Sequence, residues 1–134
     1  ATPTLDDLLL AIRQKESGGN DKAIGDSGKA RGPYQIWASY WQDACEYGKV
    51  NWDYKSCSFD PEKSKQIVKW YWQKYRPFAY LTVDVNTLSR IHNGGLEGDK
   101  NPKTLKYMRD IRKRLGLANP PTKKKPSGSP KKKR

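Results

Sequence analysis

Apolar residues at helical spacing constrain the fold of this chain more than any other feature of the sequence. The spacing i, i+3, i+4, i+7 marks a helix with one buried face. It first occurs near the N-terminus, at Leu5, Leu8, Leu9 and Ile12. Thr4 is a suitable N-cap for this helix, and Gly18 and Gly19 follow its end. The pattern therefore predicts a helix over residues 5–16.

The same kind of pattern predicts four further helices. They are expected over 34–46, from about 60 to 75, over 83–92 and from about 101 to 115. Asp60-Pro61-Glu62 and Asn101-Pro102 are strong helix starts, because an N-cap side chain precedes a proline there. No β pattern is clear, although the loop at 20–33 has room for a small hairpin. We therefore expect a mostly helical α+β fold with about five helices in one domain, residues 1–116.

The positive charge is concentrated at the C-terminal end. The net charge is +13, and seven of the basic residues lie in 117–134, a segment of Pro, Lys, Ser and Gly with no acidic residue. Such a composition cannot bury a core and predicts a disordered basic tail. The rest of the chain still has 20 basic and 14 acidic residues. This balance favours polyanionic partners such as nucleic acid, anionic membranes or acidic cell-wall polymers. We expect the tail to add non-specific binding to such polyanions.

Two cysteines, Cys45 and Cys57, are the only ones in the chain. Together with the single histidine, His92, they make a poor zinc site, and we expect no metal. The alternatives are a disulfide and two buried thiols, and we favour the disulfide, which implies an oxidising compartment. No apolar run approaches the ~20 residues that a membrane span needs. The start Ala1-Thr2-Pro3 is compatible with prior removal of a signal peptide, so we expect a secreted protein.

Two acidic residues flank a glycine-rich loop in KESGGNDKAIGDSGKARGPYQI, residues 15–36. Glu16 follows Ile12 by four positions, so its carboxyl lies on the apolar side of the first helix, where burial raises its pKa. Asp26 lies among Gly and Ser residues, a polar and hydrated setting. A protonated acid opposite an ionised carboxylate is the pair that cleaves glycosidic bonds, as in lysozyme, the usual example. The alternative is a surface acid at Glu16 and a turn residue at Asp26.

Four short motifs support the catalytic alternative. They are Lys15-Glu16-Ser17-Gly18, Gly32-Pro33-Tyr34-Gln35-Ile36, Tyr40-Trp41-Gln42-Asp43 and Arg90-Ile91-His92-Asn93-Gly94-Gly95. In order and spacing they resemble the invertebrate-type lysozymes, the family that includes destabilase, over roughly residues 8–115. The first two motifs also resemble soluble lytic transglycosylases, but the HNGG segment, followed by Thr104 and Tyr107, favours the invertebrate type.

This resemblance implies a lysozyme-like fold that cleaves the β-1,4 bond between N-acetylmuramic acid and N-acetylglucosamine in peptidoglycan. Glu16 matches the acid of the family, and Asp26 lies near its second acid, with an interval about one residue shorter. Positions that line the family's cleft are matched by Tyr34, Gln35, His92, Asn93 and Gly94. No cofactor is implied. The expected partner is peptidoglycan or another bacterial cell-wall polymer, bound by a monomer.

The chain departs from this family in two ways. Its members are usually rich in cysteine, whereas this chain keeps Cys45 and Cys57 alone, and the lysine-rich tail has no counterpart. An isopeptide-cleaving activity, reported for some members, stays open through Ser27 and His92. Two other functions also stay open: a lytic transglycosylase acting on the same bond, and a basic nucleic-acid-binding or virion protein with a lysozyme-like body.

Overall fold

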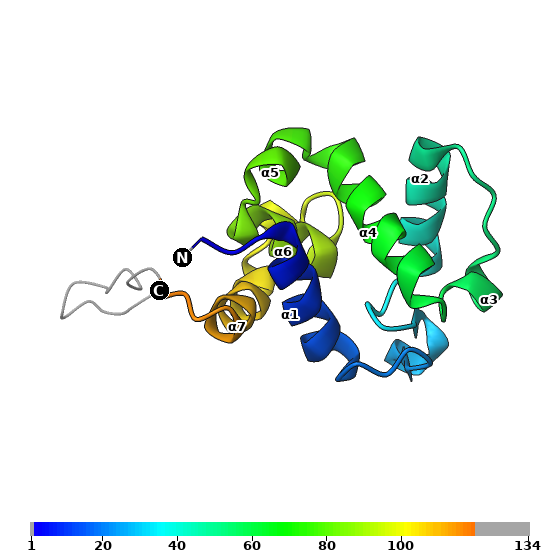
Figure 1. The fold of residues 1–134 in the computed structure, drawn as a ribbon, viewed down its shortest axis with the longest axis horizontal. Helices are drawn as coiled ribbons and strands as arrows, with labels where there is room; N and C mark the ends of the chain where they lie inside the picture. The colour runs from blue at the N-terminus through cyan, green and yellow to red at the C-terminus, as the bar shows by residue number, and fades with distance from the viewer. Residues whose placement is uncertain (1, 120–134) are drawn as a thin grey trace.

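Seven α-helices and one two-stranded sheet make up the described part of the chain, residues 2–119, in a computed structural model (Figure 1). The helices are α1 (Leu5–Ser17), α2 (Ala38–Gly48), α3 (Tyr54–Cys57), α4 (Pro61–Tyr75), α5 (Pro77–Thr82), α6 (Val85–Gly94) and α7 (Leu105–Arg114). The antiparallel strands are β1 (Ile24–Gly25) and β2 (Ala30–Arg31). The predicted α+β fold, with its small hairpin between 20 and 33, is confirmed.

All five predicted helices are present, and two short ones were missed. α3 has four residues and α5 has six, too few to show a helical period in the sequence. The second helix begins at Ala38 instead of residue 34, because residues 31–36 form an extended turn closed by a β-bridge between Arg31 and Ile36. A short 3₁₀ turn, Pro102–Thr104, precedes α7.

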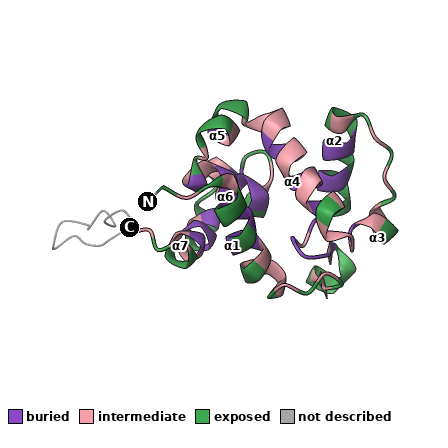
Figure 2. Cartoon of the chain, in the orientation of Figure 1, coloured by how far each residue is buried: buried purple, intermediate pink, exposed green. Residues whose placement is uncertain are grey.

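The core is rich in aromatic side chains, and α4 lies at its centre. Trp72 is fully buried, and its indole N–H donates to the backbone oxygen of Leu88 on α6 at 3.0 Å. Tyr71 stacks on Tyr40 of α2 with ring centroids 3.7 Å apart. Figure 2 shows buried residues on the sides of the helices that face one another. This packing joins α2, α4 and α6 into the frame that carries the site.

Helix α1 is fixed at both ends. At its start, the Thr4 hydroxyl accepts from the backbone N–H of Asp7, and the Asp7 carboxylate accepts from the backbone N–H of Thr4. At its end, Gly18 has a φ of 63° and closes the last turn. Glu16 therefore lies in a helical turn that the capping interactions hold in place.

The predicted disulfide is absent from the structure, in which Cys45 and Cys57 are free. Cys45 is buried on α2, and Cys57, at the end of α3, packs against the same core cluster. Burial raises the pKa of the Cys45 thiol. Apolar contact, not a covalent bond, therefore joins this segment to α2.

The predicted basic tail falls mostly on residues 120–134, which lie outside the described residues. Its disorder and the domain boundary after residue 116 therefore stay predictions. Within residues 2–119, no helix is both long and apolar enough to span a bilayer.

Candidate active site

A cavity of about 500 Å³ opens between the end of α1, the β1–β2 hairpin, the start of α2 and the end of α6. Its lining residues are Glu16, Asp26, Gln35, Trp37, Ser39, Tyr40, Asp43, Tyr71, His92, Asn93, Gly94 and Gly95. Three of them are acids and none is a lysine or arginine. The cavity is therefore acidic, in a chain whose net charge is +13.

Glu16 is the buried acid of this cavity. Its side chain is 20% exposed, and burial raises its pKa from 4.5 to about 7. The hydroxyl of Tyr107, on α7, donates to Glu16 Oε2 at 2.7 Å, which opposes the rise without cancelling it. The carboxyl is therefore substantially protonated near neutral pH, as a general acid must be.

His92 lies beside Glu16 but does not form an ion pair with it. The carbonyl oxygen of Tyr34 lies 2.9 Å from His92 Nε2 and can only accept, so Nε2 carries the hydrogen. His92 Nδ1 then accepts from the hydroxyl of Tyr40 at 2.8 Å. Burial lowers the pKa of His92 to about 4, so the ring is neutral at neutral pH. Its Nε2 lies 3.6 Å from Glu16 Oε2, and the contact is one of packing.

Asp26 lies on the exposed turn of the hairpin. Asp26 and Ser27 have φ values of 50° and 57°, in the left-handed region that few residues other than glycine adopt. The indole N–H of Trp37 donates to Asp26 Oδ2 at 3.3 Å. This bond and the strained turn aim the carboxylate into the cavity opposite Glu16, whose pKa it raises slightly through its charge.

Gln35 lines the cavity and also braces the hairpin. Its φ is 53°, and its Nε2 donates to the carbonyl oxygens of Ala23 at 3.1 Å and Gly32 at 3.0 Å. A Cβ on Gly25 would lie 2.4 Å from Gln35 Oε1, so a larger residue there would displace the side chain of Gln35. Gln35, which was expected to contact sugar, therefore also holds strand β1, which leads to Asp26.

The side chain of Tyr34 does not reach the cavity, contrary to its expected role in substrate binding. It is buried and lines a separate hollow of about 100 Å³ with residues of α1 and α4. Burial there raises the pKa of Tyr34 to about 12. The ring is held by the packing of α1 on α4, so Tyr34 acts on the site through its carbonyl oxygen alone, which holds His92.

Asn93 and Gly94 lie at the exposed end of α6 and line the cavity as expected. A Cβ on Gly94 would lie 2.6 Å from the Thr104 Cγ2. Glycine there allows the end of α6 to pack closely against the turn before α7. Asn93, next to this glycine, is exposed at the cavity wall.

Ser27 and His92 are not coupled in the structure. The hydrogen bonds of the His92 ring go to Tyr34 and Tyr40, and Ser27 is not among the residues that line the cavity. This arrangement gives no support to the isopeptide-cleaving alternative.

Seven residues of the site were missed from the sequence: Tyr107, which binds Glu16, and six that line the cavity, Trp37, Ser39, Tyr40, Asp43, Tyr71 and Gly95. Tyr107 precedes Ile111 by four positions, so the apolar stripe of the last helix was the signal that could have placed it inward. Asp43 lies on α2, one turn after Ser39, and its Oδ2 accepts from the hydroxyl of Tyr75 at 2.8 Å. Trp37 gave no such signal, because its indole meets Asp26 only through the fold of the hairpin.

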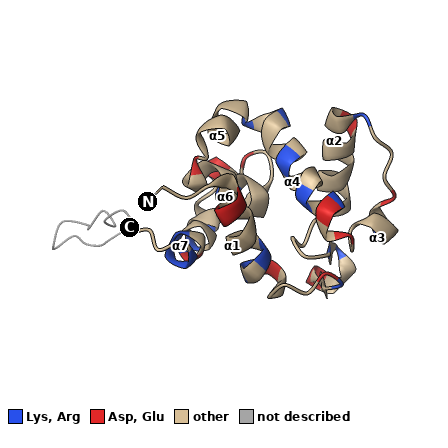
Figure 3. Ribbon diagram, viewed as in Figure 1, with Lys and Arg blue, Asp and Glu red and all other residues tan. Residues whose placement is uncertain are grey.

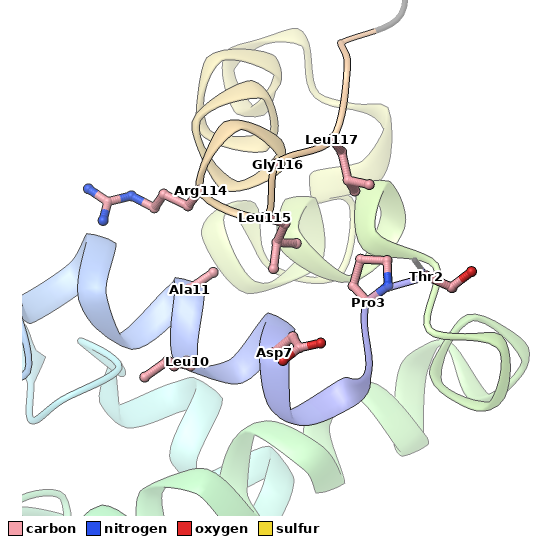
Figure 4. Close-up of a pocket in the computed structure, with 9 residues that line it drawn as sticks. All are labelled: Thr2, Pro3, Asp7, Leu10, Ala11, Arg114, Leu115, Gly116 and Leu117. Atoms are coloured by element: carbon pink, nitrogen blue, oxygen red, sulfur yellow. The ribbon is translucent and has the colours of Figure 1, made fainter.

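A second hollow, of about 520 Å³, lies where the segment before α1, α1 itself and the end of α7 meet (Figure 4). Its titratable residues are Asp7 and Arg114, and Asp7 caps α1. It offers no pair of acids, so the cavity at Glu16 is the better candidate for catalysis. Among residues 2–119, no three His, Cys, Asp or Glu side chains come together as a metal site would require.

Comparisons with known proteins show what this chain is similar to. The sequence model of the Destabilase family matches residues 6–114. The invertebrate-type lysozyme of Ruditapes philippinarum is 37% identical over 109 residues, which cover 78% of this chain and 77% of that protein. The lysozyme of Magallana gigas is 31% identical over 80 residues, 60% of this chain and 56% of its own length.

Two solved structures share the fold. The Tapes japonica lysozyme superposes with a TM-score of 0.65 at 31% identity, over 84% of this chain and 94% of that one. The Meretrix lusoria lysozyme, solved in complex with Aeromonas hydrophila PliI, gives 0.67 at 27% identity, over 84% and 93%. The match of sequence and fold leads to one conclusion. The chain belongs to the destabilase family of invertebrate-type lysozymes, which are glycoside hydrolases.

Proposed function

We propose that this protein hydrolyses the β-1,4 bond between N-acetylmuramic acid and N-acetylglucosamine in peptidoglycan and so lyses bacteria. The observation that carries the proposal is the pKa of Glu16, raised to about 7 by burial in a cavity that it shares with Asp26. A carboxyl that keeps its proton near neutral pH can deliver it to the glycosidic oxygen as the bond breaks.

Asp26 is the second carboxylate in this scheme. When Glu16 protonates the leaving oxygen, positive charge develops on the sugar ring, and an exposed carboxylate across the cavity stabilises it or forms a bond to the sugar. The hydrogen bond from Trp37 holds the Asp26 carboxylate in place. Water then completes hydrolysis, with Glu16 now acting as the base that removes its proton.

The remaining lining residues suit a sugar chain. Gln35 and Asn93 offer amide groups to hydroxyl and N-acetyl groups, and the exposed face of Trp37 offers a surface on which a sugar ring can stack. Gly94 leaves room at the cavity wall. Such a substrate lies outside the producing cell, which supports a secreted protein.

Replacement of Glu16 by glutamine tests the proposal. Glutamine keeps the size of the side chain but has no proton to deliver, so the rate of lysis of bacterial walls should fall at least about a hundredfold. Glu97→Gln is the matched control, because Glu97 is exposed, outside the cavity, and carries the same change of charge. Lysis that survives Glu16→Gln at more than a few per cent of the control would contradict the proposal.

Two alternative functions, a lytic transglycosylase and a nucleic-acid-binding or virion protein, can be tested with variants of the two acids. A lytic transglycosylase needs the acid but no second carboxylate, and it leaves an anhydro-muramic sugar instead of a reducing end. Asp26→Asn should therefore abolish hydrolysis but spare transglycosylation. A nucleic-acid-binding or virion protein with a lysozyme-like body would keep its main activity in Glu16→Gln.

A further inference from the structure

The net charge of this protein comes entirely from its C-terminal end. Residues 1–99 contain 13 Lys and Arg and 13 Asp and Glu, so they are neutral overall. Residues 100–134 contain 14 Lys and Arg and a single acid, Asp110. Within the described part of this segment, the basic residues are concentrated on α7 and the turns before it.

Helix α7 has one buried side and one basic side. Tyr107, Met108 and Ile111 are buried. At about 100° per residue, Lys106, Arg109 and Lys113 lie within about 60° of one another, nearly opposite the buried side. Arg114 lies about 80° further round from Lys106, toward α1, where it lines the second hollow. Figure 3 shows mainly basic residues on α7, whereas α1 and α4 carry residues of both signs.

One acid of α7, Asp110, is bound to Lys15 of α1 at 2.9 Å. This bond lowers the pKa of Asp110, and Lys106 and Arg114 are close enough for their charges to lower it as well. Among residues 2–119, no carboxylate lies within 4.0 Å of the side-chain nitrogens of the other basic residues of this surface, Lys106, Arg109, Lys113 and Arg114. Basic residues elsewhere are often paired, as Arg76 is with Asp99 at 2.9 Å. We call the four residues Lys106, Arg109, Lys113 and Arg114 the α7 basic face.

We propose that the α7 basic face is a second binding surface, separate from the cavity, for a linear phosphodiester polymer of the bacterial cell wall, of the poly(glycerol phosphate) type. The choice of a wall polymer rests on the proposed function. The attraction itself does not, because four cations without an ion pair, along about 12 Å of helix, suit any chain of regularly spaced phosphates.

The cavity cannot bind such a polymer. Glu16, Asp26 and Asp43 line it without a lysine or arginine, so it repels a polyanion and accepts a neutral glycan. The cavity would therefore bind the glycan of the wall, and the α7 basic face its phosphodiester polymer. The two surfaces also share one helix, since the buried side of α7 carries Tyr107, which holds Glu16. A polymer bound to α7 would keep the cavity close to the glycan strands.

The test compares two fourfold variants in the full chain. The first is Lys106→Gln, Arg109→Gln, Lys113→Gln and Arg114→Gln. The control is Lys22→Gln, Lys49→Gln, Lys55→Gln and Lys69→Gln, which removes the same charge from lysines that have no ion pair within residues 2–119. Binding to soluble poly(glycerol phosphate) is measured by titration at several salt concentrations.

The first variant should bind at least about tenfold more weakly than wild type at low salt, with a shallower dependence of log K on log salt. The control should change by less than about threefold. An equal loss of affinity in both variants would mean that net charge alone matters, and it would overturn the proposal. Wild-type protein that does not bind poly(glycerol phosphate) would also overturn it. A duplex DNA of equal phosphate concentration is the second probe. The assignment to a wall polymer would be overturned if wild type bound the DNA more tightly and the first variant lost affinity for the DNA alone.

Turnover of a neutral chitooligosaccharide separates this proposal from the proposed function. Both fourfold variants should keep wild-type turnover, because the α7 basic face lies outside the cavity. If wild type binds poly(glycerol phosphate) through α7 but has no turnover, the proposed function fails and the binding surface stands. Should the first variant unfold, Lys106→Gln with Lys113→Gln, both exposed, replaces it, with Lys22→Gln and Lys55→Gln as control.

Discussion

The hydroxyl of Tyr107 donates a hydrogen bond of 2.7 Å to Glu16 Oε2 and so joins α7 to the last turn of α1 at the base of the cavity. This bond stabilises the ionised carboxylate, whereas burial destabilises it, and burial is the larger effect. The pKa of Glu16 is therefore about 7 because burial raises it more than the hydrogen bond from Tyr107 lowers it. Tyr107 is a positioning residue: it fixes the direction in which Glu16 presents its proton.

The first prediction concerns this balance. In Tyr107→Phe the pKa of Glu16 should rise above its value of about 7, because the group that favours the ionised form is lost. The alkaline limb of the pH–activity profile should move to higher pH, while kcat falls because the carboxyl is less well oriented. Carboxyl NMR and a pH–rate profile measure the two effects. Tyr47→Phe, at an exposed tyrosine, is the control and should leave both unchanged. A profile that keeps its position in Tyr107→Phe would show that the bond does not act on Glu16.

The second prediction is that Glu16 destabilises the folded protein at alkaline pH. The pKa of Glu16 is 4.5 in the unfolded chain and about 7 in the fold, so the unfolded state releases the proton first. The free energy of unfolding should fall as pH rises from 4.5 to 7, by up to about 3 kcal/mol. Glu16→Gln has no such proton, so it should be more stable than wild type at pH 8 by roughly that amount and lose this advantage below pH 4.5. Chemical denaturation at several pH values measures it, and a wild type that is equally stable at pH 8 would refute it.

Much of the fold could be predicted from the sequence, because long helices carry their own period. The stripe from Leu5 to Ile12 is enough to predict α1 and to turn Glu16 toward the core. The hairpin and the two short helices lack that information, because two to six residues contain less than two periods. Their positions are set by contacts with distant residues.

The structure brings part of the predicted set of site residues together, and the roles of these residues stay predictions. Glu16, Asp26, Gln35, His92, Asn93 and Gly94 meet at one cavity as expected. The direction of Tyr34 could not be read from its motif, since an aromatic side chain in a turn can face either the cleft or the core. The bonds from Tyr107 to Glu16 and from Trp37 to Asp26 span 91 and 11 positions, so no local pattern reveals them.

The third prediction concerns the cysteines. Because the structure holds Cys45 and Cys57 as free residues, the denatured, unreduced protein should react with two equivalents of a thiol reagent. The native protein should react faster at Cys57, which is half-buried, than at Cys45, where burial raises the thiol pKa. Mass spectrometry after labelling measures the number of reactive thiols and the rate at which each cysteine reacts. Absence of labelling in the denatured protein would restore the disulfide that the sequence suggested.

The fourth prediction separates two uses of Trp37. Its indole N–H binds Asp26 at 3.3 Å, and its ring, 45% exposed, lines the cavity. Trp37→Phe keeps an aromatic surface for the sugar but removes the N–H, so kcat should fall by roughly tenfold while KM changes little. Trp37→Leu removes the aromatic surface as well, and KM should then rise too. Kinetics on a chitooligosaccharide measure both, and thermal unfolding should show little change, because Trp37 is largely outside the core. A loss in Trp37→Phe that falls wholly on KM would mean that the indole N–H contacts substrate and does not position Asp26.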